Sequence, residues 1–372
     1  MIVQFLCVLM MCVARLTEQR RTDYVPRTMM STTGSAVYAG SADDHPYNIT
    51  TSSDFDLIPR NLTGVLLVFS AGHRVAFDRG TLPRGLGGPS LERLQMSVRY
   101  APGRLIPSGF FVNLARLRSI TLYHDDPAPD FSLKLSDGAF EGLTEVVELV
   151  LAGLGIEDLP AGLFRDLHSV RHLDLGQNQL AVIESGVFRP SPAPTPAGSP
   201  ENHCCLNLTT LWLGGNRFGD VADIRLSGLT SLRKIDLYGN NISNLHRGSF
   251  GLDGRAASTS AGGFANVEEL NLDDNVIGNV TNDAFEPLVQ LRTFYLAFNM
   301  LRNVTASAFS GLPALETLDL NNNSILTLGS GIFASLTSLR KLVLSENAID
   351  AIQTGIVTSS ETECSSDFRV NL

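Results

Sequence analysis

The sequence is poor in cysteine, tryptophan and charged residues, and each shortage excludes something. Five cysteines in 372 residues are too few for a disulfide-rich fold, and one tryptophan with 18% charged side chains indicates no particular chemistry. Basic residues are also in the minority, because 28 Lys and Arg face 38 Asp and Glu, for a formal net charge of -10. Nucleic acid and anionic membranes reward the opposite balance and are therefore disfavoured partners. What the chain does have is 44% hydrophobic residues, enough to bury a sizeable core.

Long apolar runs are confined to the amino terminus. Residues 1–14 are almost wholly apolar and end at Ala14, which Arg15 follows. This segment is typical of a secretory signal peptide, although the basic residues that usually open one are missing. A signal anchor and an ordinary buried segment remain the alternatives. No other stretch of the sequence approaches the roughly 18 apolar residues of a membrane span, so we expect a secreted or extracellular protein, or the ectodomain fragment of a membrane receptor.

Seven Asn-x-Ser/Thr sequences support passage through the secretory pathway. An asparagine-rich chain produces some of these by chance, so they are suggestive rather than decisive. The candidate glycosylation sites are Asn48, Asn61, Asn207, Asn241, Asn279, Asn303 and Asn322.

An internal repeat organises most of the chain. The pattern Leu-x-x-Leu-x-Leu-x-x-Asn occurs in Leu315–Asn323 and again, 24 residues later, in Leu339–Asn347. Ten such units begin at Leu91, Leu117, Val146, Val170, Leu208, Leu232, Val267, Leu291, Leu315 and Leu339. A phenylalanine recurs eighteen residues after most of these starts, and an apolar residue recurs three residues before the next start. One short strand and its return segment cannot bury their apolar edge alone, so we expect the units to stack around one continuous core.

The ninth position of the repeat is an asparagine in seven units: Asn178, Asn216, Asn240, Asn275, Asn299, Asn323 and Asn347. A side-chain amide at this position can bond the backbone groups that a turn leaves unpaired, and repetition in register predicts an asparagine ladder. A helical bundle is excluded, because the leucine spacing alternates between three and two and Asn and Gly interrupt every unit.

The repeat resembles the typical 24-residue leucine-rich repeat of extracellular animal proteins such as Toll-like receptor ectodomains, Slit proteins and related matrix proteins. The resemblance covers residues 91–353. It implies an α/β solenoid, a curved horseshoe with a parallel β-sheet on the concave face and a mostly irregular or short-helical convex side.

The composition outside the repeats predicts the remaining organisation. Residues 15–55, rich in Ser, Thr, Asp and Ala, are expected to be disordered, and residues 56–90 look like an amino-terminal cap without the cysteines of that family's caps. Inserts near 189–203 and 251–263 interrupt the array at the same phase, which puts both on one side, away from the concave strands. They are tolerated surface loops, a fault of the gene model, or dedicated partner loops. Residues 354–372 look like an incomplete carboxy-terminal end, as if the sequence were truncated or mis-terminated.

The three cysteines beyond residue 14 do not pair within one solenoid. Cys204 and Cys364 lie at least five strand steps apart, more than about 20 Å, whereas a disulfide needs Cα atoms within about 7 Å. Cys205 lies three residues before Leu208, where other units have an apolar residue, so we expect a buried thiol. Cys204 is then the exposed one, able to pair between molecules.

The histidines do not indicate a metal site. His203 lies beside two adjacent cysteines without the spaced second pair that zinc requires. His168 and His172 have helical spacing, but the repeat puts His172 inside a strand. We find no phosphate-binding loop, and the repeat brings no Ser, His and Asp together. We therefore expect no cofactor, no metal and no enzyme activity.

Side chains between the leucines alternate onto the concave face and can vary without harming the core. Exposed Trp and Tyr there are typical anchors of protein interfaces. The candidate ligand-binding residues are Tyr123, Trp212, Tyr238, Asp273, Asp274, Tyr295 and Phe298. A charged stripe around Glu268 and Glu269 is either a solvated face or a recognition patch. A glycan on Asn322 would cover the carboxy-terminal part of the same face.

These features predict an extracellular recognition protein that binds a protein or microbial ligand, or a cell-surface partner, through the concave face. The alternative is a structural or adhesive component of the extracellular matrix.

Overall fold

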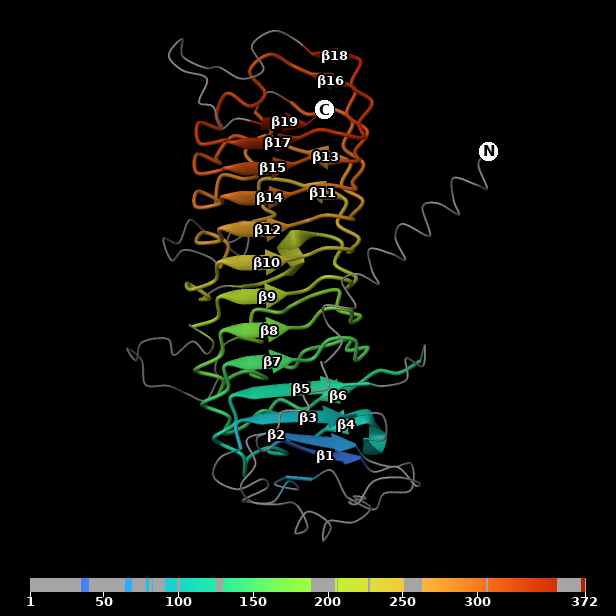
Figure 1. Ribbon diagram of the computed structural model, residues 1–372, viewed down its shortest axis with the longest axis vertical. Helices are drawn as coiled ribbons and strands as arrows, with labels where there is room; N and C mark the ends of the chain where they lie inside the picture. Colours follow the sequence, from blue (N-terminus) through green and yellow to red (C-terminus); the bar gives the residue numbers. More distant parts are fainter. Residues whose placement is uncertain are drawn as a thin grey trace.

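The computed structural model describes residues 35–39, 64–68, 91–98, 101–124, 130–188, 207–226, 228–250, 263–305, 307–352 and 369–371, with residues 78, 79, 82 and 205 (Figure 1). The expected signal peptide and almost all of both inserts lie outside these residues, as do Cys204, Cys364 and the candidate glycosylation sites Asn48 and Asn61.

A parallel β-sheet of 13 strands forms one wall of the molecule and stacks along its long axis (Figure 1). Each of the ten repeat starts is followed two residues later by one strand of this sheet. The ten strands are β3 (Arg93–Ser97), β5 (Ser119–Tyr123), β7 (Glu148–Val150), β8 (His172–Asp174), β9 (Thr210–Trp212), β10 (Lys234–Asp236), β12 (Glu269–Asn271), β14 (Thr293–Tyr295), β15 (Thr317–Asp319) and β17 (Lys341–Val343). The predicted parallel sheet is confirmed.

Three further strands extend the sheet beyond the ten repeats. At one end β1 (Ser35–Ala39) pairs with β2 (Gly64–Val68), which pairs with β3. β1 falls within residues 15–55, where composition predicts disorder. At the other end β19 (Arg369–Asn371) pairs with β17.

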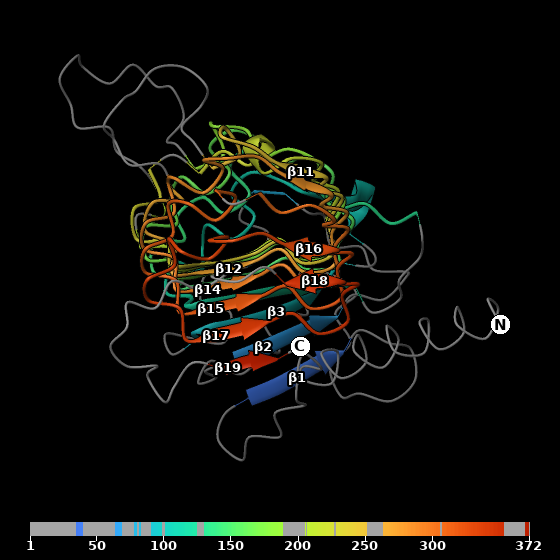
Figure 2. The ribbon, with the colours of Figure 1, turned by 90° about the horizontal axis from the view of Figure 1, so that it is seen from above.

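The rest of each turn closes the path around the core on the other sides, as the view from above shows (Figure 2). It contains three short two-stranded sheets: β4 (Leu105–Ile106) with β6 (Lys134–Leu135), β11 (Asn244–Leu245) with β13 (Asn279–Val280), and β16 (Thr327–Leu328) with β18 (Ala351–Ile352). Within the described part of the chain, helix is limited to two 3-10 helices of three residues each, η2 (Pro102–Arg104) and η3 (Val221–Asp223). Elsewhere the return path uses single turns closed by one backbone bond, such as Leu167 N–H to the Phe164 carbonyl at 3.0 Å. The fold is thus a β-solenoid with almost no helix.

The core is built from the first, fourth and sixth residues of each repeat and from the recurrent phenylalanines. Leu208, Leu211 and Leu213 of one unit are all fully buried. The phenylalanines stack from unit to unit with ring centroids 5.5–6.1 Å apart, in the two series Phe111, Phe140, Phe164, Phe188 and Phe250, Phe285, Phe309, Phe333. Leu226, also buried, takes the place of phenylalanine between the two series. These contacts join all the described repeats into one core.

The asparagine ladder is present. In Asn216, for example, the side-chain nitrogen donates to the Leu213 carbonyl of its own repeat and the Leu175 carbonyl of the preceding one, both at 2.9 Å. Its oxygen accepts the Leu180 N–H at 3.0 Å. Each asparagine therefore bonds two neighbouring repeats to each other where the chain leaves the strand.

Cys205 is fully buried, as predicted, with its sulfur 3.8 Å from the Phe164 carbonyl oxygen. It occupies the core position that leucine fills in most other units.

Candidate functional site

The outer face of the 13-stranded sheet, here called the sheet face, carries the candidate ligand-binding residues at three positions of the repeat. Trp212 and Tyr295 lie at position five, on the strand itself, where the side chain points outward. Tyr123, Tyr238 and Asp273 lie at position seven, and Asp274 and Phe298 at position eight. Positions seven and eight follow the three-residue strands, so Tyr238, Asp273, Asp274 and Phe298 line the edge where the chain turns away. Tyr123 differs, because it is the last residue of the five-residue strand β5.

The structure brings six of the seven together. They belong to the repeats of β9, β10, β12 and β14, which are consecutive strands of the sheet. Trp212 and Tyr295 are three strand steps apart, about 14 Å at the usual strand spacing. Tyr123 is the exception, because it ends β5, three strands before β9.

Trp212 lies between two carboxylates. The strand register places Asp174 of β8 opposite it on one side and Asp236 of β10 on the other. The His172 ring stacks beside the indole, with centroids 6.1 Å apart and an angle of 30° between the ring planes. The His172 Nδ1 atom is buried and has no hydrogen-bond partner among the described residues. Trp212 is half-buried.

Position five also has a structural role in four other repeats between β8 and β15. The side-chain oxygen of Asp174, Asp236, Asn271 and Asp319 accepts the backbone N–H two residues further along, at 2.9–3.0 Å. This short bond stabilises the turn that leaves the strand. None of these side chains was predicted from the sequence as a site residue, although an Asp or Asn directly after the fourth-position core residue could have indicated them.

Tyr295 cannot make that bond, and a neighbouring side chain replaces it. The N–H of Ala297, two residues after Tyr295, donates to Asp273 Oδ1 of the adjacent repeat at 2.7 Å. Burial raises the pKa of the Tyr295 phenol, and the charges of Glu269, Asp273 and Asp319 raise it further, while Lys234 opposes them. The phenol therefore stays neutral in an acidic part of the sheet face.

The charged stripe beside these residues consists largely of ion pairs between adjacent strands. Lys234 Nζ lies 2.6 Å from Glu269 Oε1, Arg233 Nε lies 3.2 Å from Glu268 Oε1, and Arg292 pairs with Glu316 at 2.5 Å. All six side chains are between 35% and 57% exposed, so water screens these pairs. The arginines and the lysine are thus compensated by their neighbours.

Phe298 is the most conspicuous exposed side chain at the edge. Its backbone is left-handed, with φ of 55°, and the side chain is 44% exposed. Position eight is left-handed in eight units, where the residues are Gly153, Gln177, Gly215, Gly239, Asp274, Phe298, Asn322 and Glu346. Phe298 is the one bulky apolar residue in that series. Two further exposed apolar side chains lie near it in the sequence, Met300 in the same repeat and Val276 in the preceding one.

Five candidate glycosylation sites can be placed. Asn207, Asn241, Asn279 and Asn303 are exposed, and Asn322 is half-buried. Asn322 lies at position eight of its repeat, after the strand rather than on it. Phe298 occupies the same position in the preceding repeat. A glycan on Asn322 would therefore cover the edge near Phe298. Their glycosylation remains a prediction.

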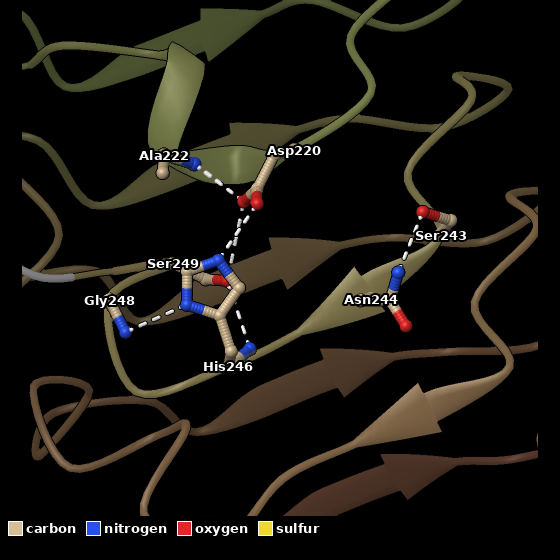
Figure 3. A network of polar contacts seen from close by, with 7 residues as sticks. All are labelled: Asp220, Ala222, Ser243, Asn244, His246, Gly248 and Ser249. Atoms are coloured by element: carbon tan, nitrogen blue, oxygen red, sulfur yellow. Dashed lines mark hydrogen bonds and ion pairs between the residues drawn. The ribbon is translucent and has the colours of Figure 1, made fainter.

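The repeat phase predicted no meeting of Ser, His and Asp, but three such side chains do come together outside the equivalent positions of the repeat. On another wall, beside β11, Asp220 Oδ2 lies 2.8 Å from His246 Nε2, and the Ser249 hydroxyl lies 3.4 Å from Asp220 Oδ1 (Figure 3). The Gly248 N–H donates to His246 Nδ1 at 3.1 Å, so we assign the ring proton to Nε2, which donates to Asp220.

This network holds the loop of residues 246–249 against Asp220. It does not form the chain of hydrogen bonds from serine to histidine to aspartate that activates a nucleophilic serine. Ser249 is 2% exposed, and its hydroxyl accepts the His246 backbone N–H at 3.0 Å, while both His246 and Ser249 bond the same carboxylate. A relay would require the imidazole between Ser and Asp. The repeat pattern could not predict the meeting, because Asp220 and His246 occupy different positions in successive units.

Neither a metal cluster nor a membrane span is found in the part of the chain that the structure describes. No three or more His, Cys, Asp and Glu side chains there are arranged to hold a metal ion. No helix among the described residues is both long and apolar enough to cross a bilayer.

Comparison with known proteins gives one family match. The family model described as "Leucine rich repeat" matches residues 290–349, which hold β14, β15 and β17 and their ladder asparagines. The chain is a leucine-rich repeat protein. Human Podocan-like protein 1 is 34% identical over 113 residues, which are 30% of this chain. The match spans only 19% of the length of that relative.

Among solved structures, an internalin from Listeria monocytogenes is similar over 76% of this chain and 73% of its own, with 18% identity and a TM-score of 0.41. Leucine-rich repeat domains typically bind proteins, and families with this solenoid are generally non-catalytic.

Proposed function

We propose that this leucine-rich repeat protein is an extracellular recognition protein that binds a protein ligand through the sheet face between β9 and β14. Trp212 and Tyr295 are the anchors, with Tyr238 and Phe298 beside them at the edge. The recognition surface so defined is called the aromatic patch. Tyr123 lies outside it.

One observation carries the proposal. Between β8 and β15, position five is an Asp or Asn that bonds the following turn, except at Trp212 and Tyr295. At Tyr295 the neighbouring repeat supplies the missing bond through Asp273. The fold thus accommodates large aromatic side chains at two positions where a small polar residue serves the turn. Half-buried aromatic side chains on a rigid sheet lose little conformational entropy on binding, which suits them as anchors.

An extracellular setting is part of the proposal. It is supported by the apolar amino-terminal segment, by the exposed asparagines of four Asn-x-Ser/Thr sequences, and by the partial similarity to Podocan-like protein 1. That similarity also favours the second candidate, a structural or adhesive component of the extracellular matrix. A matrix role would require ligand sites on more than one side of the solenoid, whereas a dedicated recognition protein needs only the patch.

The test is a screen in which this protein, fused to a dimerising tag to raise its avidity, is offered to a panel of secreted and cell-surface proteins. Affinity measurements with variants then follow. Trp212→Ala and Tyr295→Ala should each lower the affinity for the partner found by tenfold or more, about 1.4 kcal/mol or more. Tyr123→Ala is the matched control, an aromatic truncation on the same sheet outside the patch, and should change affinity less than twofold. Thermal unfolding must show that all three variants remain folded. Unchanged binding by both patch variants would exclude the patch as the binding surface.

A further inference from the structure

The sheet face from β8 to β15 is strongly acidic. At positions three, five, seven and eight of these six strands there are six carboxylates and one ammonium group, that of Lys234, which pairs with Glu269. The carboxylates are Asp174, Asp236, Glu269, Asp273, Asp274 and Asp319. Arginine is absent from these positions, so the face has an excess of negative charge next to its aromatic side chains.

The turn does not require that charge. Asn271 makes the same side-chain bond to the N–H two residues ahead, at 3.0 Å, that Asp174, Asp236 and Asp319 make at 2.9 Å. A neutral amide is therefore sufficient for the local structure. Asp174 and Asp236 lie two strands apart, about 10 Å, close enough for their like charges to repel.

The aromatic side chains lie where a cation would meet both a ring and a carboxylate. Trp212 is flanked in register by Asp236, which is half-buried, and by Asp174, which is 8% exposed, and Tyr295 is opposite the half-buried Asp319. An ammonium or guanidinium group over an indole or phenol ring gains a cation–π contact, and adjacent carboxylates add to the attraction. The separation of the two rings, about 14 Å, matches about four residues of extended chain.

We propose that the aromatic patch recognises a cationic segment of its partner, an extended stretch with Lys or Arg side chains about four residues apart. The segment runs across β9, β10, β12 and β14 and places one cation at Trp212 and another at Tyr295. This assignment rests on the proposed function and adds the charge of the partner to it.

The protein's single tryptophan is in the patch, so its fluorescence reports binding directly. The probes are two ten-residue peptides of Gly and Ser, one with Lys and one with Glu at the first, fifth and ninth positions. We expect the Lys peptide to change Trp212 emission saturably and the Glu peptide to leave it unchanged. Raising NaCl from 50 to 300 mM should weaken Lys-peptide binding severalfold, because salt screens exposed charges.

The decisive variant is the triple change Asp174→Asn, Asp236→Asn and Asp319→Asn, which removes three charges and keeps an acceptor for each turn. We expect its affinity for the Lys peptide to fall at least tenfold, with a Tm equal to or above that of the unmodified protein. The matched control is Glu157→Gln with Asp158→Asn, two exposed carboxylates outside the sheet face, which should change affinity less than twofold. If the triple variant unfolds, Asp319→Asn alone serves the same comparison, with a smaller loss expected.

Equal binding of the Lys and Glu peptides, no binding of either, or unchanged affinity of the triple variant would overturn the inference. Failure of the proposed function looks different. If the partner found by screening still binds Trp212→Ala and Tyr295→Ala, the patch itself is wrong. If that partner loses binding to these two variants but binds the triple variant normally, the patch stands and its preference for cations is wrong.

Discussion

At the residue scale, Phe298 combines an unfavourable backbone conformation with an exposed side chain. A left-handed φ of 55° is easy for glycine and tolerated by asparagine, but strained for a bulky residue, at a cost of about 1 kcal/mol. The next repeat has Asn322 at the same position, with φ of 51°. We therefore expect Phe298→Asn to raise the free energy of unfolding by about 0.5–1 kcal/mol in urea titrations. The reverse change, Asn322→Phe, should lower it by a similar amount.

A less stable Phe298→Asn variant would mean that the packing of the phenyl ring against neighbouring side chains outweighs the backbone strain. A more stable variant that binds its partner less well would instead show that stability has been given up for recognition at this position.

Because of Tyr295, we expect the free energy of unfolding to decrease at alkaline pH. Its folded-state pKa is raised, first by burial and then by Glu269, while an unfolded tyrosine ionises near pH 10. From about pH 10 upward the unfolded chain loses a proton that the folded protein retains, so stability falls as pH rises; below that range this group has no effect. Tyr295→Phe should thus lose less Tm than the unmodified protein between pH 9 and 11. Parallel Tm curves for the two proteins across this range would contradict the assignment.

At the scale of the repeat element, the ladder asparagines hold successive turns in register. Asn275 is 5% exposed; its oxygen accepts the Ile242 N–H at 3.1 Å and its nitrogen donates to the Leu237 and Leu272 carbonyls at 3.0 and 3.1 Å. Alanine there leaves these buried groups without partners, each at about 1–3 kcal/mol. We expect Asn275→Ala to cost about 3 kcal/mol or more by urea unfolding.

Asn347→Ala is the control for this prediction, because Asn347 makes the same bonds but is only half-buried. Water can then replace its lost bonds, so the cost should be clearly smaller. Equal losses in the free energy of unfolding for the two variants would show that burial does not determine how much each ladder asparagine contributes to stability.

The same scale shows what the sequence could predict. The strand of every repeat lies two residues after its predicted start, because leucines at positions one, four and six can only be buried together in one backbone arrangement. Phe111 and Phe140 were missed from the phenylalanine stack, since their repeats are longer and the fixed offset of eighteen residues fails there. The carboxylates of Asp174 and Asp236 were also missed: the flanking of Trp212 depends on strand register, which relates residues 38 and 24 apart in the chain.

The seven candidate residues divide for a related reason. Alternation along a strand correctly placed Trp212 and Tyr295 on the sheet face, but it does not apply beyond the ends of the three-residue strands β10, β12 and β14. Tyr238, Asp273, Asp274 and Phe298 therefore line the turn edge. The contacts of Asp220 with His246 lie outside the repeated positions altogether, where periodicity carries no information.

At the scale of the whole molecule, one core runs through all the described repeats, yet each repeat contacts only its neighbours. In such arrays, stability is approximately a sum of repeat and interface terms, so damage should stay local. Leu318, fully buried at the centre of β15, pairs in register with Phe294 of β14 and Leu342 of β17. Leu318→Ala should cost about 3–5 kcal/mol through the cavity it leaves.

Hydrogen exchange measures where that loss is felt. In Leu318→Ala we expect the amides of β14, β15 and β17 to exchange faster, while those of β7 and β8 keep their protection. Leu149 is the fully buried counterpart in β7. In Leu149→Ala we expect β7 and β8 to exchange faster, while β14, β15 and β17 keep their protection. Uniform loss of protection in both variants would mean that the solenoid unfolds as one cooperative unit. Local loss of protection would have a functional consequence. Because β14 carries Tyr295, Leu318→Ala should weaken ligand binding at the Tyr295 end of the aromatic patch. Leu149→Ala lies two strands from β9 and should leave Tyr295 and its neighbours ordered.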